Sequence, residues 1–264
     1  MRPYRWLFAI LFVAPDGTGL YPTIQSAVDA AVDGDQVRLY SGVYGGEGNQ
    51  SIKFSGKAIV VTSDAEDPSA VTMAPDIYPI AFVFDSFEGP GSILQDITFA
   101  CATWTDRMLF VGGSPTIRNC VFDVNGVSML IAGGPRIESC NFLGGPDDFA
   151  TDFYFGHRHF VMVNCSTPNG AHVGGEDCLL YRCDFARVGV SGEGVLRESN
   201  VGTLTVRDVA SYGGCTRIED CVVGEIVKET PLACYRMVNT APAELDGPLN
   251  FEAPSWGSIK GSYR

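Results

Sequence analysis

The sequence predicts an all-β solenoid, in which short strands stack in parallel to form about seven to nine rungs. The first observation behind this prediction is a recurring pattern of an apolar residue, two variable residues, cysteine, one residue and a second apolar residue. Full or nearly full copies lie at 117–122, 137–142, 161–165, 180–185 and 218–223, and weaker copies at 94–99 and 196–201. The second observation is the spacing, because Cys120, Cys140, Cys165 and Cys183 follow one another at intervals of 20, 25 and 18 residues. Such a period is typical of solenoids.

Each copy of the pattern has to contain a bend. The first apolar residue and the cysteine are three positions apart, so a straight strand would point them to opposite faces. The bend falls on Asn119, Ser139, Asn164 and Asp220, and asparagine and aspartate adopt left-handed backbone angles at little cost. Each repeat therefore reads as strand, corner, strand. Rungs stacked about 4.8 Å apart would align like residues into internal ladders.

Turns precede two of the copies. The chain reads Gly-Gly-Ser-Pro at 112–115 and Gly-Gly-Pro at 133–135, where a turn has to redirect it into the next strand. This punctuation excludes a helical interpretation of the repeats.

The N-terminal part predicts a cap on the solenoid. Residues 12–36 are expected to form a first strand and a short helix, because Thr23 is a good N-cap and Gly34 a good end. The apolar face of this helix would consist of Ile24, Ala27, Val28, Ala31 and Val32. The rungs would occupy 37–240, and the proline-containing residues 241–264 an irregular C-terminal cap. We expect one domain over 1–264, because no linker-like stretch divides it.

The opening segment resembles that of known proteins. It reads VAPDGTG at 13–19, YPTIQSAVDAA at 21–31, GDQV at 34–37 and SGVY at 41–44. Together, this opening and the repeats cover about residues 12–223. They are similar to the right-handed parallel β-helix superfamily of pectate lyases, pectin methylesterases and polygalacturonases. The resemblance implies a single-stranded right-handed β-helix with a helical cap. It also implies, by analogy, a protein that binds or processes carbohydrate outside the cytoplasm.

Charge and hydropathy limit the partners. The formal net charge is −13, which disfavours nucleic acid because phosphates would be repelled. An acidic polysaccharide would need bound cations or a local basic groove.

Residues 1–14 carry Arg2 and Arg5 before a short apolar stretch, which fits either an export signal or, as we favour, a first strand. The stretch is too short to span a membrane.

The nine cysteines predict a ladder more than a disulfide framework. At the repeated inward position we expect buried, reduced thiols that pack as small hydrophobic groups. The better candidates for disulfides are Cys178 with Cys183 and Cys215 with Cys221, and neither pair has the spacing of a zinc knuckle.

The candidate catalytic residues lie in the most polar and irregular rung and its neighbours. The resemblance to polygalacturonases, which use clustered aspartates and a histidine, points to Asp147 and Asp148 with His172. Asp148 would be the acid, Asp147 the base that activates water, and His172 an orienting group. Asp123, one rung-length before Asp147, is a neighbour. Two further neighbours complete the set: Asp152 and His157.

Two alternatives to a glycoside hydrolase stay open. A polysaccharide lyase would use Arg158 or Arg187 as base or carboxylate clamp, with aspartates holding calcium. A non-catalytic structural, adhesive or surface-interaction module would need none of these residues. Its aromatic platforms for sugar rings would come from a set of six residues: Trp104, Tyr154, Phe155, Phe160, Tyr212 and Tyr235. The sequence does not predict the oligomeric state.

Overall fold

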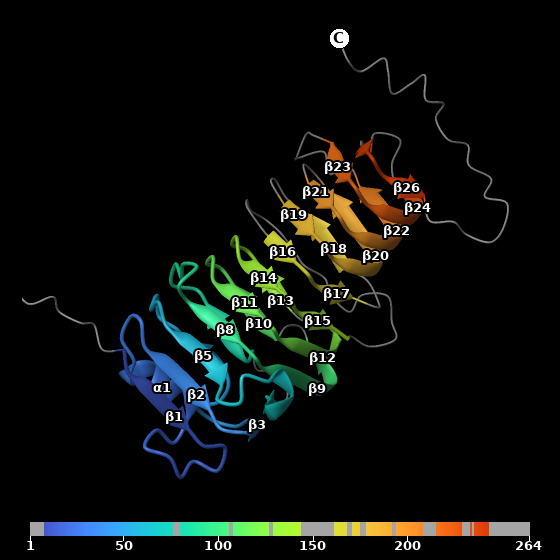
Figure 1. Ribbon diagram of the computed structural model, residues 1–264. Coiled ribbons are helices and arrows are strands. Elements are labelled where there is room, and N and C mark those ends of the chain that lie inside the picture. Colours follow the sequence, from blue (N-terminus) through green and yellow to red (C-terminus); the bar gives the residue numbers. More distant parts are fainter. Residues whose placement is uncertain are drawn as a thin grey trace, which may run out of the picture.

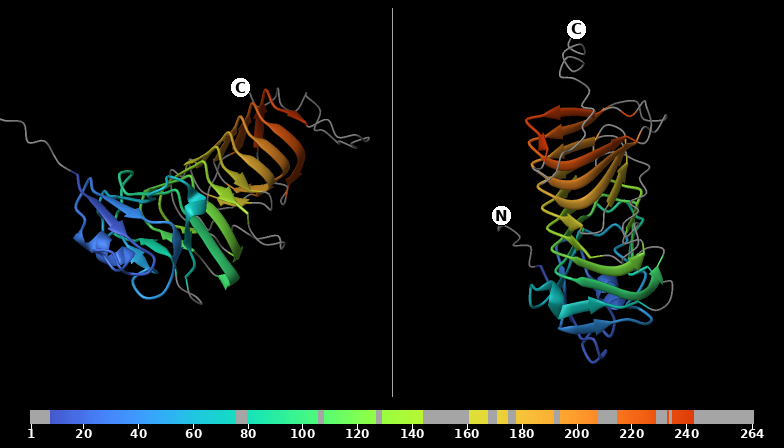
Figure 2. Two further views of the ribbon diagram at one scale, coloured as in Figure 1. Left: turned by 60° about the horizontal axis from the view of Figure 1, so that its bottom comes forward. Right: turned by 90° about the vertical axis from the view of Figure 1, so that its right-hand side faces the viewer.

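The computed structural model describes residues 8–75, 80–105, 108–126, 129–143, 161–167, 171–174, 178–191, 194–207, 215–228, 233 and 235–242. These residues form an elongated stack of strands arranged in three sheets (Figures 1 and 2). Their strands pair in parallel, because the chain returns to each sheet from the same side in successive rungs. The all-β solenoid predicted from the repeat is therefore confirmed.

The first long sheet, sheet A, has 11 strands and runs from the N-terminal to the C-terminal end of the stack. In spatial order they are β1 (Ile10–Val13), β2 (Gln36–Leu39), β5 (Val60–Ser63), β8 (Ile93–Gln95), β11 (Thr116–Arg118), β14 (Arg136–Glu138), β16 (Val161–Val163), β19 (Cys178–Tyr181), β21 (Gly194–Arg197), β23 (Thr216–Glu219) and β25 (Tyr235–Val238). The number of strands in sheet A exceeds the seven to nine rungs predicted, because early rungs such as those of β2 and β5 lack the cysteine pattern.

The second long sheet, sheet B, follows the corner in most rungs. Its strands are β3 (Gly42–Tyr44), β6 (Val71–Met73), β9 (Thr98–Thr105), β12 (Val121–Gly126), β15 (Asn141–Phe142), β17 (Ser166–Thr167), β20 (Asp184–Ser191), β22 (Asn200–Arg207), β24 (Val222–Lys228) and β26 (Ala241–Pro242), with β18 (Ala171–Gly174) also paired to β20. A third sheet contains β4 (Ile52–Lys53), β7 (Phe82–Phe84), β10 (Leu109–Val111) and β13 (Met129–Ile131). The residues expected to form the C-terminal tail thus begin with a strand, and 243–264 lie outside the described part.

The predicted cap is present at the N-terminal end of the stack. Helix α1 (Ile24–Ala30) packs on β1 and β2, and the hydroxyl of its N-cap, Thr23, accepts the backbone N–H of Ser26 at 3.2 Å. The helix ends before Gly34, because the C-cap Ala31 has an extended backbone. Val32 therefore lies outside the helix and is 65% exposed, so its assignment to the buried face is wrong. A short 3₁₀ turn (Pro68–Ala70) precedes β6.

The four predicted corners are confirmed. Asn119, Ser139, Asn164 and Asp220 have φ between 48° and 53°, and each backbone N–H donates to a carbonyl of the next rung, as in the 2.9 Å bond from Asn119 to Glu138. The same left-handed geometry recurs at Asp96, Arg182, Glu198 and Asn239. The corner is thus a regular structural position of the stack.

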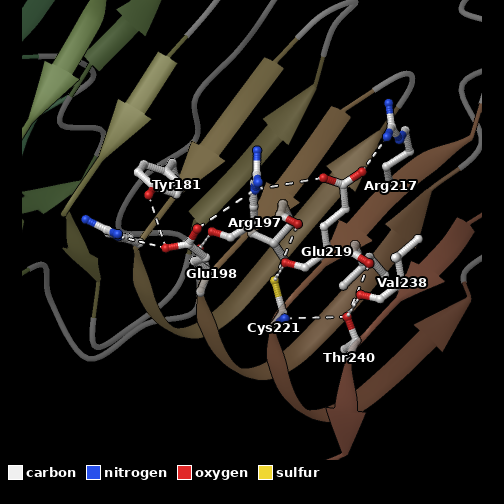
Figure 3. Close-up of polar contacts among 12 residues, drawn as sticks. Tyr181, Arg197, Glu198, Arg217, Glu219, Cys221, Val238 and Thr240 are labelled. Carbon is white, nitrogen blue, oxygen red and sulfur yellow. Dashed lines mark hydrogen bonds and ion pairs between the residues drawn. The ribbon is translucent and has the colours of Figure 1, made fainter.

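The internal ladders are formed by like residues in register. Cys120, Cys140, Cys165 and Cys183 occupy successive rungs and are buried, and the amide of Cys140 lies 3.4 Å from the Cys165 sulfur. Ser199, Cys221 and Thr240 continue this column. Figure 3 shows Cys221 and Thr240 on their successive rungs. On the neighbouring sheet-B strands, stacked phenyl rings form a second ladder.

The cysteines of the ladder are reduced thiols, as predicted. The two disulfides suggested by the sequence are wrong, because neither Cys178, Cys183 nor Cys221 is part of a disulfide. Cys215 does take part in one. Burial raises the pKa of the Cys140 and Cys165 thiols well above their usual range, so these groups stay protonated and unreactive in the folded protein.

One hydroxyl in the core has no partner among the described residues. The Oγ1 of Thr167 is buried and makes no hydrogen bond there, whereas the Oγ1 of buried Thr116 donates to the Pro90 carbonyl at 3.0 Å. We expect Thr167→Val to raise the free energy of unfolding by about 1 kcal/mol, and Thr116→Val to lower it by about the same amount. Urea denaturation measures both. A loss of stability in Thr167→Val would show that its hydroxyl is satisfied in solution.

Candidate functional site

The predicted catalytic residues are only partly within the described structure. Asp147, Asp148, Asp152 and His157 lie outside the described residues, as does Arg158 of the lyase alternative. Asp123 lies on β12 with an exposed side chain. His172 lies on β18, opposite Gly189 of β20.

Asp123 and His172 both belong to sheet B but occupy different columns. Pairing aligns Val121 with Asn141, Ser166 and Asp184 in turn. Asp123 therefore shares the column of Ala186, whereas His172 aligns with Gly189, three positions further along β20. The role of these two residues, and of the four outside the described part, stays a prediction.

A different polar cluster stands out on sheet A. Its outward positions carry arginine on several rungs between β11 and β25, and we call this row the arginine strip. Across neighbouring strands Val195, Arg217 and Arg236 align in one outward column, and Tyr181, Arg197 and Glu219 in the other. Including the corner residue Arg182, the strip consists of Arg118, Arg136, Arg182, Arg197, Arg217 and Arg236.

Glutamates lie beneath the arginines and hold them. Glu198 accepts a 2.9 Å hydrogen bond from Nε of Arg182 and lies 3.9 Å from Nε of Arg197. Glu219 lies 4.0 Å from the same Arg197 nitrogen and also pairs with Arg217 (Figure 3). Charge therefore alternates across β19, β21 and β23 and links their rungs.

The arginines are the outer layer of this network. The side chains of Arg136, Arg182, Arg197 and Arg217 are 50–58% exposed, whereas those of Glu138, Glu198 and Glu219 are only 16–35% exposed. A molecule approaching sheet A thus meets guanidinium groups first. These cations gather on one face of a protein whose formal net charge is −13.

Both members of the Arg182–Glu198 pair are ionised at neutral pH. The hydrogen bond from Arg182 is the main reason that the pKa of Glu198 lies below its usual range, with a further contribution from the Tyr181 hydroxyl. The same bond raises the pKa of Arg182. The fixed charges favour recognition of an anion, because guanidinium groups donate to carboxylates and phosphates in planar pairs.

The sequence contains a pattern that indicates this strip, although a comparison with family motifs does not detect it. Arg136-Ile137-Glu138 and Arg217-Ile218-Glu219 place arginine and glutamate on either side of an inward residue, so both point outward from a strand. The pairing between rungs depends on register, which sequence alone does not provide.

The other predicted ligand groups lie only partly within the described residues. Within the described residues no group of three or more histidine, cysteine, aspartate or glutamate side chains is placed to hold a metal ion. Of the aromatic residues predicted as sugar platforms, Tyr235 is half-buried against the core with Lys228 over its ring at 5.0 Å. Nor is any described helix long and apolar enough to cross a bilayer.

The fold defines the class of the protein: it is a right-handed parallel β-helix. A solved structure described as pectate lyase Pel9A is similar to this chain, with a TM-score of 0.57 and 14% sequence identity over 92% of this chain and 82% of that one. At this identity the likeness concerns the fold. No protein-family model and no curated protein matches the sequence.

Proposed function

We propose that this protein binds an anionic carbohydrate on the arginine strip, outside the cytoplasm. The observation that carries the proposal is the layering of the strip, in which exposed guanidinium groups cover less exposed carboxylates. An acidic protein otherwise repels polyanions, so a concentration of cations on one face supplies the basic surface that an acidic glycan requires.

The shape of the strip suits an extended ligand. Strands β11 to β25 follow one another at about 4.8 Å, so the strip is roughly 30 Å long. Its guanidinium groups recur along a rigid sheet and need little ordering upon binding. A chain of acidic sugars, which repeats one charged group per unit, can therefore contact several rungs at once.

The disulfide at Cys215 supports a location outside the cytoplasm, because disulfides persist in oxidising compartments. The fold of a pectate lyase supports a carbohydrate ligand by analogy. Cleavage is a separate prediction, for which Asp147, Asp148 and their neighbours remain the candidates.

The decisive experiment compares two charge reversals. Arg197→Glu alters the strip, and Lys53→Glu reverses a charge at an exposed position of β4 in the third sheet. We expect the wild type to bind a galacturonate oligosaccharide in calorimetry. We expect Arg197→Glu to bind at least about tenfold more weakly, because charged hydrogen bonds to the ligand are lost. Lys53→Glu should differ little.

A neutral ligand serves as the control. A galactose oligosaccharide of the same length should bind weakly, because it carries no carboxylates for the guanidinium groups. Equal losses in the two variants, or equal affinity for the neutral sugar, would refute the proposed site. Assaying the same mixtures for new reducing or unsaturated ends reports whether binding is accompanied by hydrolysis or elimination.

A further inference from the structure

Two corners of the stack depart from the residue types that this backbone position favours. Six described corners in this column carry asparagine, aspartate or serine, whereas Arg182 and Glu198 occupy the other two with φ of 53° and 48°. Left-handed angles are unfavourable for most side chains, and asparagine and aspartate tolerate them best. The two exceptions are on consecutive rungs and contact each other.

The backbone does not require these residues at the two corners. The N–H of Arg182 donates to the Arg197 carbonyl, and the N–H of Glu198 to the Glu219 carbonyl, both at 3.0 Å. The Asn119 and Asn164 corners make the same bond at 2.9 and 3.0 Å. Asparagine would therefore serve the fold equally well, and the identity of Arg182 and Glu198 needs another reason.

The side chain of Glu198 gathers three donors. Its carboxylate accepts from the Tyr181 hydroxyl at 3.1 Å and from Nε of Arg182 at 2.9 Å, and it lies 3.9 Å from Nε of Arg197 (Figure 3). The guanidinium of Arg182 also lies over the Tyr181 ring, 4.8 Å from its centre. An exposed ion pair contributes little to stability, so the arrangement is better explained by what it holds in place.

We infer that Glu198 is a positioning residue, which holds Tyr181, Arg182 and Arg197 as a preformed subsite for one acidic group of the bound carbohydrate. This inference rests on the proposed function and adds a specific location within the strip. The ligand contacts are the exposed guanidinium groups and the Tyr181 ring. Glu198 acts through them, because ordering these long side chains beforehand lowers the entropic cost of binding.

Positioning and simple charge attraction predict opposite results for the loss of Glu198. If only the net charge of the strip mattered, removal of a carboxylate would strengthen the binding of an anion. If Glu198 orders the arginines, its removal weakens binding even though the surface becomes more positive. The sign of the change therefore separates the two explanations.

The test uses Glu198→Gln and Glu198→Asn, with Glu225→Gln on the exposed face of β24 as the matched loss of charge. Calorimetry with the galacturonate oligosaccharide should show about tenfold weaker binding for both Glu198 variants, as expected for loss of preorganised contacts, and little change for Glu225→Gln. The melting temperature of Glu198→Asn should equal or exceed that of the wild type, because asparagine suits the corner.

A second measurement does not depend on the ligand. In ¹⁵N spectra, the Nε–H of Arg182 should exchange slowly with solvent in the wild type and faster in Glu198→Gln. Unchanged solvent exchange of the Arg182 Nε–H in Glu198→Gln would overturn the inference alone. So would equal or tighter binding by the Glu198 variants in an experiment in which Arg197→Glu loses affinity. Failure of the wild type to bind the oligosaccharide would instead overturn the proposed function, and with it the assignment of Glu198.

Discussion

Phe122→Ala is expected to lower the free energy of unfolding by about 3–5 kcal/mol. The Phe122 ring is fully buried between Phe99 and Phe142, with ring centres 4.8 and 4.9 Å away and interplanar angles of 6° and 7°. Its removal leaves a cavity inside the stack and breaks two stacking contacts at once. Because β9, β12 and β15 hold their backbones in register, neighbouring side chains cannot collapse freely into the space.

Urea denaturation followed by circular dichroism measures this effect. Val43→Ala is the control, since Val43 lies on β3 of the same sheet with its side chain largely exposed. We expect the control to change stability by less than about 0.5 kcal/mol. A Phe122→Ala protein within about 1 kcal/mol of the wild type would mean that the phenyl ladder contributes less than burial predicts.

Gly133→Ala is expected to destabilise the protein as strongly as Phe122→Ala, because the added Cβ would clash with backbone atoms. A Cβ at Gly133 would lie 1.9 Å from the carbonyl oxygen of Gly113, and a Cβ at Gly113 would lie 2.7 Å from that of Glu88. The turns of successive rungs therefore stack with no room for a side chain between them. No rotamer change relieves a clash with a backbone oxygen, so the rungs must separate and lose hydrogen bonds. We expect a destabilisation of about 3 kcal/mol or more, or failure to fold.

Gly89→Ala is the matched control for this substitution. No atom lies within 4 Å of the Cβ position at Gly89, and its backbone is not left-handed. Its melting temperature should therefore stay close to that of the wild type. Comparable melting temperatures for Gly133→Ala and Gly89→Ala would contradict the close stacking of the turns.

Much of the fold follows from local patterns. The cysteine repeat predicts the rungs, and the corner residues Asn119 and Asn164 predict the bends, because both depend on the conformational preferences of neighbouring residues. The glycine turns are predictable for the same reason. The apolar pattern places the end of α1 too late, since Asp35 accepts the Val32 backbone N–H at 2.9 Å and competes with continuation of the helix.

The candidate site is much less predictable. Motif matching leads to Asp148 and His172, which lie about one rung-length apart in the sequence. The arginine strip depends on which strands are adjacent, and Glu198 meets Arg182 only because the corners of successive rungs coincide. The arginine and the glutamate at these corners resemble no family motif.

The repeating unit, its corners and the composition of its internal ladders can all be read from the amino-acid order, because they depend on side-chain parity and on left-handed backbone preferences over a few residues. Which charged side chains face one another is known only from the folded stack, since rung lengths vary and the register between rungs is set by packing along its whole length. The proposed binding surface depends on that register, because its charged side chains come together only where β19, β21 and β23 lie side by side.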